Sequence, residues 1–137
     1  MTQEKGMGIR AENVARADRV MRSLTERNNS ITKTKLRSMF ALLTDLFNEV
    51  SISREERLSG EQINQLLAAK VRIVYEIGRE ERKDQIRSFI DETELLSELD
   101  AVMAAATRGS FIEFYHYFEA LVAYQRYYET MLGKKGN

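Results

Sequence analysis

Several residue types on which enzymes and secreted proteins depend are missing from this chain. Its 137 residues include no proline, no cysteine and no tryptophan, and they include a single histidine, His116. Without proline nothing forces a break in a helical hydrogen-bond ladder, and without cysteine there is no disulfide framework or thiolate metal site. A Ser-His-Asp arrangement would rest entirely on His116, and GxSxG, P-loop and HExxH motifs are absent. We therefore expect a protein with no enzymatic activity, metal or other cofactor.

The chain also lacks a net charge and any long apolar run. No apolar run approaches the ~20 residues that span a bilayer, and the first residues have no signal-peptide core, so we expect a cytoplasmic protein without a membrane partner. Its 21 basic and 21 acidic residues count against a simple nucleic-acid binder, which is usually basic overall. However, residues 1–50 carry nine Lys or Arg against six Asp or Glu, whereas residues 51–100 carry eight against twelve. A basic patch would therefore be local and completed by partner subunits.

The composition predicts an all-α fold, because Leu, Ala, Glu, Arg and Gln favour helix and nothing interrupts it. We expect a compact bundle of about five to six helices in a single domain, residues 9–132. Residues 1–8 are expected to be disordered and residues 133–137 to form a flexible tail. The apolar periodicity predicts helices at about 9–26, 32–50, from 59 to near Gly78, 81–90, 93–106 and 111–132.

Capping residues mark three of these helices. Thr32 is a good N-cap, Ser59 with Gln62 forms a capping box, and Ser110 with Glu113 is predicted to form another. The third helix is expected to bury one apolar face, namely Ile63, Leu66, Leu67, Val71, Val74 and Ile77. The last helix is expected to bury the stripe of Phe111, Phe114, Phe118, Leu121, Val122, Tyr128 and Leu132.

Three cations open the second helix: Lys33, Lys35 and Arg37, with no acidic residue before Asp45. Cations in a first turn oppose the helix dipole at a cost of roughly 0.3–1 kcal/mol each when they are exposed. The pattern therefore suggests an external anion, and a helix N-terminus also presents free N–H groups to phosphate. The alternative is a solvated basic turn.

Arg72, Tyr75 and Arg79 share the helical face nearly opposite the apolar stripe. Arginine can bind phosphate with two hydrogen bonds, and tyrosine can stack on a base. The alternative is a surface network with Glu76 and Glu80, which lie at helical spacing from the two arginines.

Seven of the twelve aromatic residues lie in the segment from Phe114 to Tyr128. Away from the apolar stripe, small and planar polar side chains form a shallow face that could admit a neighbouring subunit or a nucleic-acid backbone; Arg126 lies in the same helix. The face comprises His116, Ala120, Ala123 and Tyr127. The alternative is that this helix is central and buried on several sides.

Three segments in this order resemble the small helical subunit of type III-A CRISPR effector complexes, the Csm small subunit. They are Thr32–Arg37, Arg72–Arg79 and Phe114–Tyr124, and the last is the most specific. The resemblance covers nearly the whole chain from Ile31 onward. It implies a small all-helical protein that lines up in several copies along a ribonucleoprotein carrying CRISPR RNA.

The resemblance also implies that the chain binds guide and target RNA through the backbone, contacts other subunits and copies of itself, and has no nuclease activity. It assigns RNA contacts to Lys33, Lys35, Arg37, Arg72 and Arg79, and Tyr75 lies beside the last two. Relatives tend to carry a basic residue at the position of His116, which is largely neutral near pH 7 when unperturbed, so a phosphate contact there would be weaker.

Two other functions remain open from the residues alone. The chain could be a helical adaptor that binds only proteins, docking through Phe114–Tyr128. Sequence-specific DNA binding by a helix-turn-helix is less well supported, because Lys33–Arg37 lacks base-reading side chains such as Asn or Gln.

Overall fold

The computed structural model describes residues 8–80 and 84–132, and these residues contain six helices and no strand. The predicted all-α class is confirmed. The segments predicted to be disordered or flexible lie outside the described residues, apart from Gly8, and so does the predicted start of the fourth helix at residue 81. The helices are α1 (Ala11–Glu26), α2 (Lys33–Ser51), α3 (Gly60–Arg79), α4 (Gln85–Thr93), α5 (Leu95–Ala105) and α6 (Arg108–Met131).

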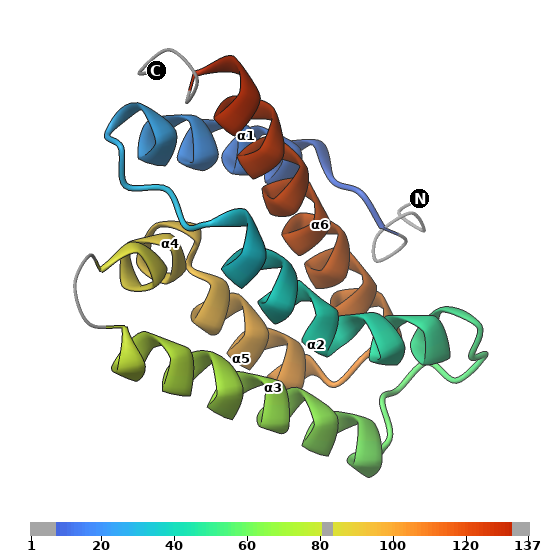
Figure 1. Ribbon diagram of the computed structural model, residues 1–137. Helices are drawn as coiled ribbons and strands as arrows, with labels where there is room; N and C mark the ends of the chain where they lie inside the picture. The colour runs from blue at the N-terminus through green and yellow to red at the C-terminus, as the bar shows by residue number, and fades with distance from the viewer. Residues whose placement is uncertain (1–7, 81–83, 133–137) are drawn as a thin grey trace.

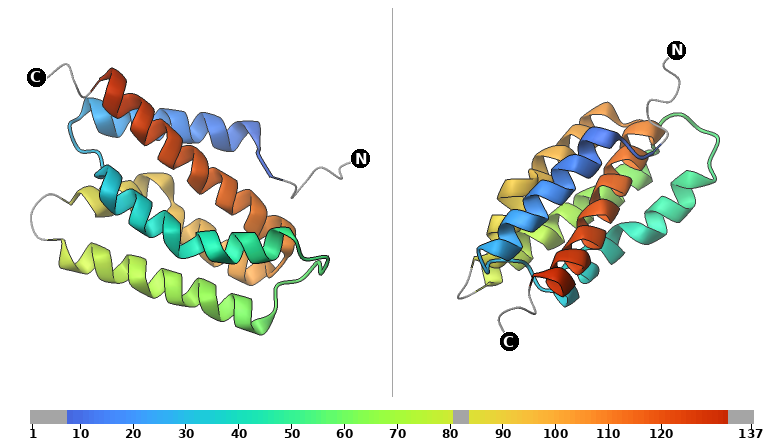
Figure 2. Two further views of the ribbon diagram at one scale, coloured as in Figure 1. Left: turned by 45° about the vertical axis from the view of Figure 1, so that its right-hand side comes forward. Right: turned by 90° about the horizontal axis from the view of Figure 1, so that it is seen from above.

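The longest helix, α6, lies in the middle of the bundle (Figure 1). It packs most extensively on α1 and α2, while α3 lies at an outer edge against α2 and α5 (Figure 2). The buried residues of α6 face several directions, because Tyr115, Tyr117 and Gln125 are buried together with Phe114 and Phe118. The interpretation of this helix as central is therefore confirmed, and its core is wider than the predicted stripe.

Aromatic stacking joins α2 to α6. The ring of Tyr115 stacks on Phe47 with centroids 3.9 Å apart and on Phe40 at 4.8 Å. At the end of α2, the Arg108 guanidinium donates to the carbonyl oxygens of Val50 and Ser51 at 3.2 and 3.0 Å. A cation suits this negative end of the helix dipole, and the contacts fix the start of α6 against the end of α2.

Polar contacts join α1 to α6. Arg16 donates to the Tyr117 hydroxyl at 2.9 Å and to the Glu98 carboxylate at 2.8 Å, and the same hydroxyl donates to the carbonyl of Thr93. Burial raises the pKa of Tyr117. The hydroxyl therefore stays protonated and able to donate.

Two of the three predicted caps are present. Thr32 accepts from the backbone N–H of Lys35 at 3.2 Å, and Ser59 and Gln62 form the complete capping box. The predicted box of Ser110 with Glu113 is wrong. Thr107 is the N-cap of α6 and accepts from the N–H of Ser110, so the helix begins three residues earlier than predicted.

The predicted buried face of α3 is also wrong in part. Leu67, Val71 and Val74 are 45%, 68% and 48% exposed, while Leu66, Ala69 and Ile73 are buried and Ile63 and Ile77 are partly buried. The reason is the position of α3 at the edge of the bundle, where α2 and α5 cover a narrow strip of it. Three large apolar side chains are thereby left on the surface.

Candidate nucleic-acid interface

The predicted basic start of α2 is on the surface. Lys33 and Arg37 are exposed and Lys35 is partly buried. None of the three forms an ion pair with a carboxylate within residues 8–80 and 84–132. They lie beside the first N–H groups of a helix, which themselves attract anions. Glu129 shares a pocket with Lys33 but forms no ion pair with it.

The predicted set on α3 has a different environment. Glu76, whose side chain is 14% exposed, accepts from Arg79 at 2.9 Å and from Arg72 at 3.3 Å. The hydrogen bond from Arg79, together with the charges of both arginines, lowers the pKa of the Glu76 carboxyl. The Arg79 guanidinium also lies 5.9 Å from the centroid of the exposed Tyr75 ring. The structure thus contains the surface network that the sequence left as the alternative.

Glu80 takes no part in that network. Its carboxylate accepts from the backbone N–H groups of Gln85 at 3.1 Å and Ile86 at 2.9 Å. The carboxylate therefore pairs with free backbone N–H groups at the N-terminus of α4 and not with the arginines of α3.

A groove between α2 and α3 brings the two predicted basic sets together. Lys35 and Leu42 line it from α2, and Arg72 and Glu76 line it from α3. The lysine and the arginine are thus on one surface, although they lie 37 positions apart in the chain. Lys33 and Arg37 are not part of the groove lining.

No residue of the predicted face of α6 lines this groove. Ala123, Arg126 and Tyr127 are exposed, while Ala120 and His116 are partly buried. The Nδ1 atom of His116 is 2.8 Å from a carboxylate oxygen of Glu119, and its ring lies edge-on to Phe47 with centroids 5.5 Å apart.

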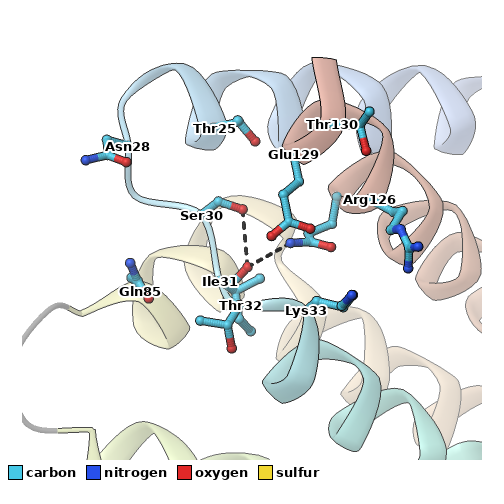
Figure 3. A pocket seen from close by; sticks show the side chains of 11 residues that line it. Thr25, Asn28, Ser30, Ile31, Thr32, Lys33, Gln85, Arg126, Glu129 and Thr130 are labelled. Atoms are coloured by element: carbon cyan, nitrogen blue, oxygen red, sulfur yellow. Dashed lines mark hydrogen bonds between the residues drawn. The ribbon is translucent and has the colours of Figure 1, made fainter. Parts of the chain in front are cut away.

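A larger pocket of about 550 Å³ lies between the α1–α2 loop and the C-terminal half of α6 (Figure 3). Lys33 and Arg126 both line it, so one member of the basic start of α2 meets one member of the α6 face there. Gln125 and Glu129, which also line it, were missed by the sequence reasoning. No local pattern could have found them, because the lining comes from separate segments of the chain.

Among the described residues there is neither a cluster of metal-binding side chains nor a membrane-spanning helix. No group of three or more His, Cys, Asp or Glu side chains among them is placed to hold a metal ion. Likewise, none of the described helices combines the length and the apolarity needed to cross a bilayer.

Comparison with known proteins gives a consistent result. A family model described as Csm2 Type III-A matches residues 10–131. The relative in Enterococcus italicus, named CRISPR system Cms protein Csm2, is 35% identical over 100 residues, covering 73% of this chain and 69% of the relative. Proteins of the same name in Mycobacterium tuberculosis and Streptococcus thermophilus are each 29% identical, covering 88% and 84% of this chain and 95% and 89% of theirs.

The matched region includes all six helices and both predicted basic sets. The resemblance found in the sequence motifs is therefore confirmed over 122 of the 137 residues. This chain belongs to the Csm2 Type III-A family, the small subunit of type III-A CRISPR effector complexes.

Proposed function

We propose that this chain is a cytoplasmic, non-catalytic subunit that holds guide and target RNA by the backbone within a type III-A CRISPR ribonucleoprotein. Membership of the family supports a place in such a complex. The observation that carries the RNA contact is the basic start of α2, where Lys33, Lys35 and Arg37 have no carboxylate partner among the described residues.

The cost of these cations supports the proposal. Each opposes the dipole of α2 by roughly 0.3–1 kcal/mol, and no described acidic side chain offsets this cost. A phosphate group bound there would offset the repulsion between the cations and the helix dipole, because it is attracted both by the cations and by the free N–H groups of the first turn. Contacts of this kind bind RNA without reading its bases.

The α2–α3 groove extends this surface. Arg72 lies across the groove from Lys35, and Arg79 and the exposed Tyr75 follow on the outer side of α3. A phosphate that binds Arg72 or Arg79 competes with Glu76 for the guanidinium. We therefore assign α3 the weaker share of the RNA contact, with Tyr75 available to stack on an unpaired base.

Exposed apolar side chains favour protein contacts as a second function of the same chain. Leu67, Val71 and Val74 lie along the outer side of α3, and a row of this kind is typical of a surface covered by another protein. We propose that neighbouring subunits, including copies of this chain, cover this row. An adaptor that docks through α6 is less well supported, because most of the aromatic side chains of α6 are buried inside the bundle.

The test of the RNA proposal is to purify the tagged protein from its native host and sequence the RNA that accompanies it. We expect short RNAs with a constant repeat-derived end and a variable remainder. Protein that carries its partner subunits but no RNA would overturn the proposal and leave the adaptor.

The apolar row has a separate test. Val71→Glu should remove the chain from the purified complex while leaving its helical circular dichroism unchanged, because Val71 is 68% exposed. Gln65→Glu, also exposed on α3 but about 120° from Val71 around the helix axis, is the matched control. Equal recovery of both variants in the complex would contradict the assignment of this row.

A further inference from the structure

The pocket between the α1–α2 loop and α6 has the size and the mixed polarity of a small-molecule site. Its volume, about 550 Å³, falls within the range of roughly 300–1,000 Å³ that is usual for such sites. Lys33 contributes one cation, and Arg126 and Glu129 contribute a cation and a carboxylate from α6. None of these three charges is paired with another described side chain. The pocket therefore contains two cations and one carboxylate, and none of them is neutralised by an ion pair with another described side chain.

Hydrogen-bond acceptors occupy one part of this pocket. Glu129 reaches from α6 toward Ile31, whereas Lys33 and Arg126 extend to the right of it in Figure 3. Gln125 is 2% exposed, and its amide nitrogen donates to the carbonyl of Ile31 at 3.2 Å. Its amide oxygen has no partner among the described residues. Because no fully buried side-chain polar atom among the described residues lacks a partner, this oxygen keeps some exposure, and Gln125 is one of the residues that line the pocket.

A ligand that satisfies this lining needs an anionic group and adjacent N–H donors. Inorganic phosphate alone would be repelled by Glu129. Guanine presents N1–H and N2–H₂ side by side, which matches the two oxygens of a carboxylate. Adenine and cytosine place an acceptor beside their amino group, and the single N–H of uracil lies between two carbonyls.

We propose that this pocket binds a guanine nucleotide. The phosphate lies against Lys33 and Arg126, and the base edge donates to Glu129 and to the amide oxygen of Gln125. The nucleotide is either free or one residue of an RNA chain, and the second case rests on the proposed RNA-binding function. The hydroxyls of Thr25 and Ser30, which also line the pocket, already donate to the carbonyls of Met21 and Ile31, so toward the ribose they act as acceptors. The hydroxyl of Thr130 lines the pocket as well.

The experiment is a titration of the isotope-labelled full chain with GMP, AMP, CMP, UMP and inorganic phosphate, followed by NMR. We expect GMP to shift the amide signals of the pocket residues and to bind about tenfold more tightly than UMP, because a bidentate contact distinguishes bases by that order. Glu129→Gln should abolish the preference for GMP. Glu119→Gln, an exposed carboxylate of the same helix that is not part of the pocket lining, should keep it.

The cations are tested in the same way. Arg126→Ala should weaken all four nucleotides alike, whereas Arg19→Ala, an exposed arginine of α1 outside the pocket, should have no effect. Equal affinities for GMP and UMP, or shifts with inorganic phosphate as large as those with GMP, would overturn the proposal. Unmoved pocket signals at millimolar GMP would also overturn it, whether or not α2 and α3 bind RNA.

A final arm separates the two sources of the nucleotide. If the pocket takes a residue of an RNA chain, a short RNA containing guanosine should move the same signals as GMP, and a guanosine-free RNA of equal length should not. If both RNAs leave the pocket unchanged while GMP binds, the ligand is the free nucleotide.

Discussion

Two basic regions to which the sequence assigns one role have different environments in the structure. At the start of α2, Lys33, Lys35 and Arg37 have no ion pair with a described carboxylate. On α3, by contrast, Arg72 and Arg79 both bind Glu76. The availability of a cation to an external anion thus depends on its neighbours as much as on its exposure.

The difference follows from where each region lies along its helix. The first turn of α2 has no acidic residue that could pair with its cations. The helix end beside these cations also attracts anions. The arginines of α3 lie three and four residues from Glu76, where side chains on a helix meet. We therefore expect α2 to contribute most of the RNA affinity and α3 to contribute less.

Removing the cations of α2 should have the largest effect. We expect the triple change of Lys33, Lys35 and Arg37 to Ala to weaken binding of single-stranded RNA about 100-fold, at roughly 1 kcal/mol per contact. The slope of log K against log salt should fall by about 2. Fluorescence anisotropy at several salt concentrations measures both. The triple variant should remain folded, because its cations oppose the α2 dipole.

The corresponding change on α3 is the matched comparison. Arg72→Ala with Arg79→Ala should weaken RNA binding by less than about tenfold, because both arginines are already shared with a carboxylate. A loss equal to that of the triple variant of α2 would remove the distinction between the two regions.

Glu76→Gln should make α3 resemble α2. With the carboxylate gone, both arginines are free for phosphate, and RNA affinity should rise roughly threefold. The free energy of unfolding should fall by about 0.5–1 kcal/mol, since two surface pairs are lost. Urea unfolding and anisotropy on the same preparation measure both changes. Unchanged RNA affinity would show that the pairing does not limit the arginines.

The pH dependence of unfolding tests the same pair. The pKa of Glu76 is lowered in the folded state, so its stabilising contribution is present above its ordinary pKa of 4.5 and is lost as the pH falls through the folded value. The stability difference between wild type and Glu76→Gln should therefore shrink below about pH 4.5. A difference that stays constant from pH 7 to pH 3 would contradict the ion pair.

The smallest effect is expected at Tyr128, which belongs to neither basic region. Its hydrogen bond to Asp18 raises its pKa to about 12. The resulting stability is complete below the unfolded pKa of 10.0 and is lost as the pH rises toward 12. The free energy of unfolding of Tyr128→Phe should change less steeply with pH between 10.0 and about 12 than that of wild type. The variant should bind RNA as wild type does at pH 7. Weaker RNA binding by this variant would show that the scaffold, not the cations, controls affinity.

Local chemistry explains what the sequence predicted well. The caps at Thr32 and Ser59 depend on residues within three positions of each other, so their patterns are sufficient. The start of α6 was predicted incorrectly because Thr107 and Ser110 are both good caps, and the choice depends on how Arg108 reaches the end of α2.

Tertiary packing explains what the sequence missed. The apolar period of α3 identifies a stripe, but it does not show that α3 lies at an edge, where Val71 stays exposed. The assignment of five cations and one tyrosine of α2 and α3 to the RNA contact stays a prediction. The sequence left open whether Arg72 and Arg79 pair with Glu76, and the structure contains both pairs. The pocket of Gln125 and Glu129 was missed because its walls come from separate segments.

The most direct test of the RNA-binding role of α2 is lysine footprinting of the chain with and without added RNA. Acetylation followed by mass spectrometry reports each lysine separately, and Lys70, held by Asp100 at 2.8 Å on the other side of α3, is the internal reference. RNA should protect Lys33 and Lys35 several-fold and leave Lys70 unchanged. Equal acetylation of Lys33 and Lys35 in the presence and absence of bound RNA would contradict the account.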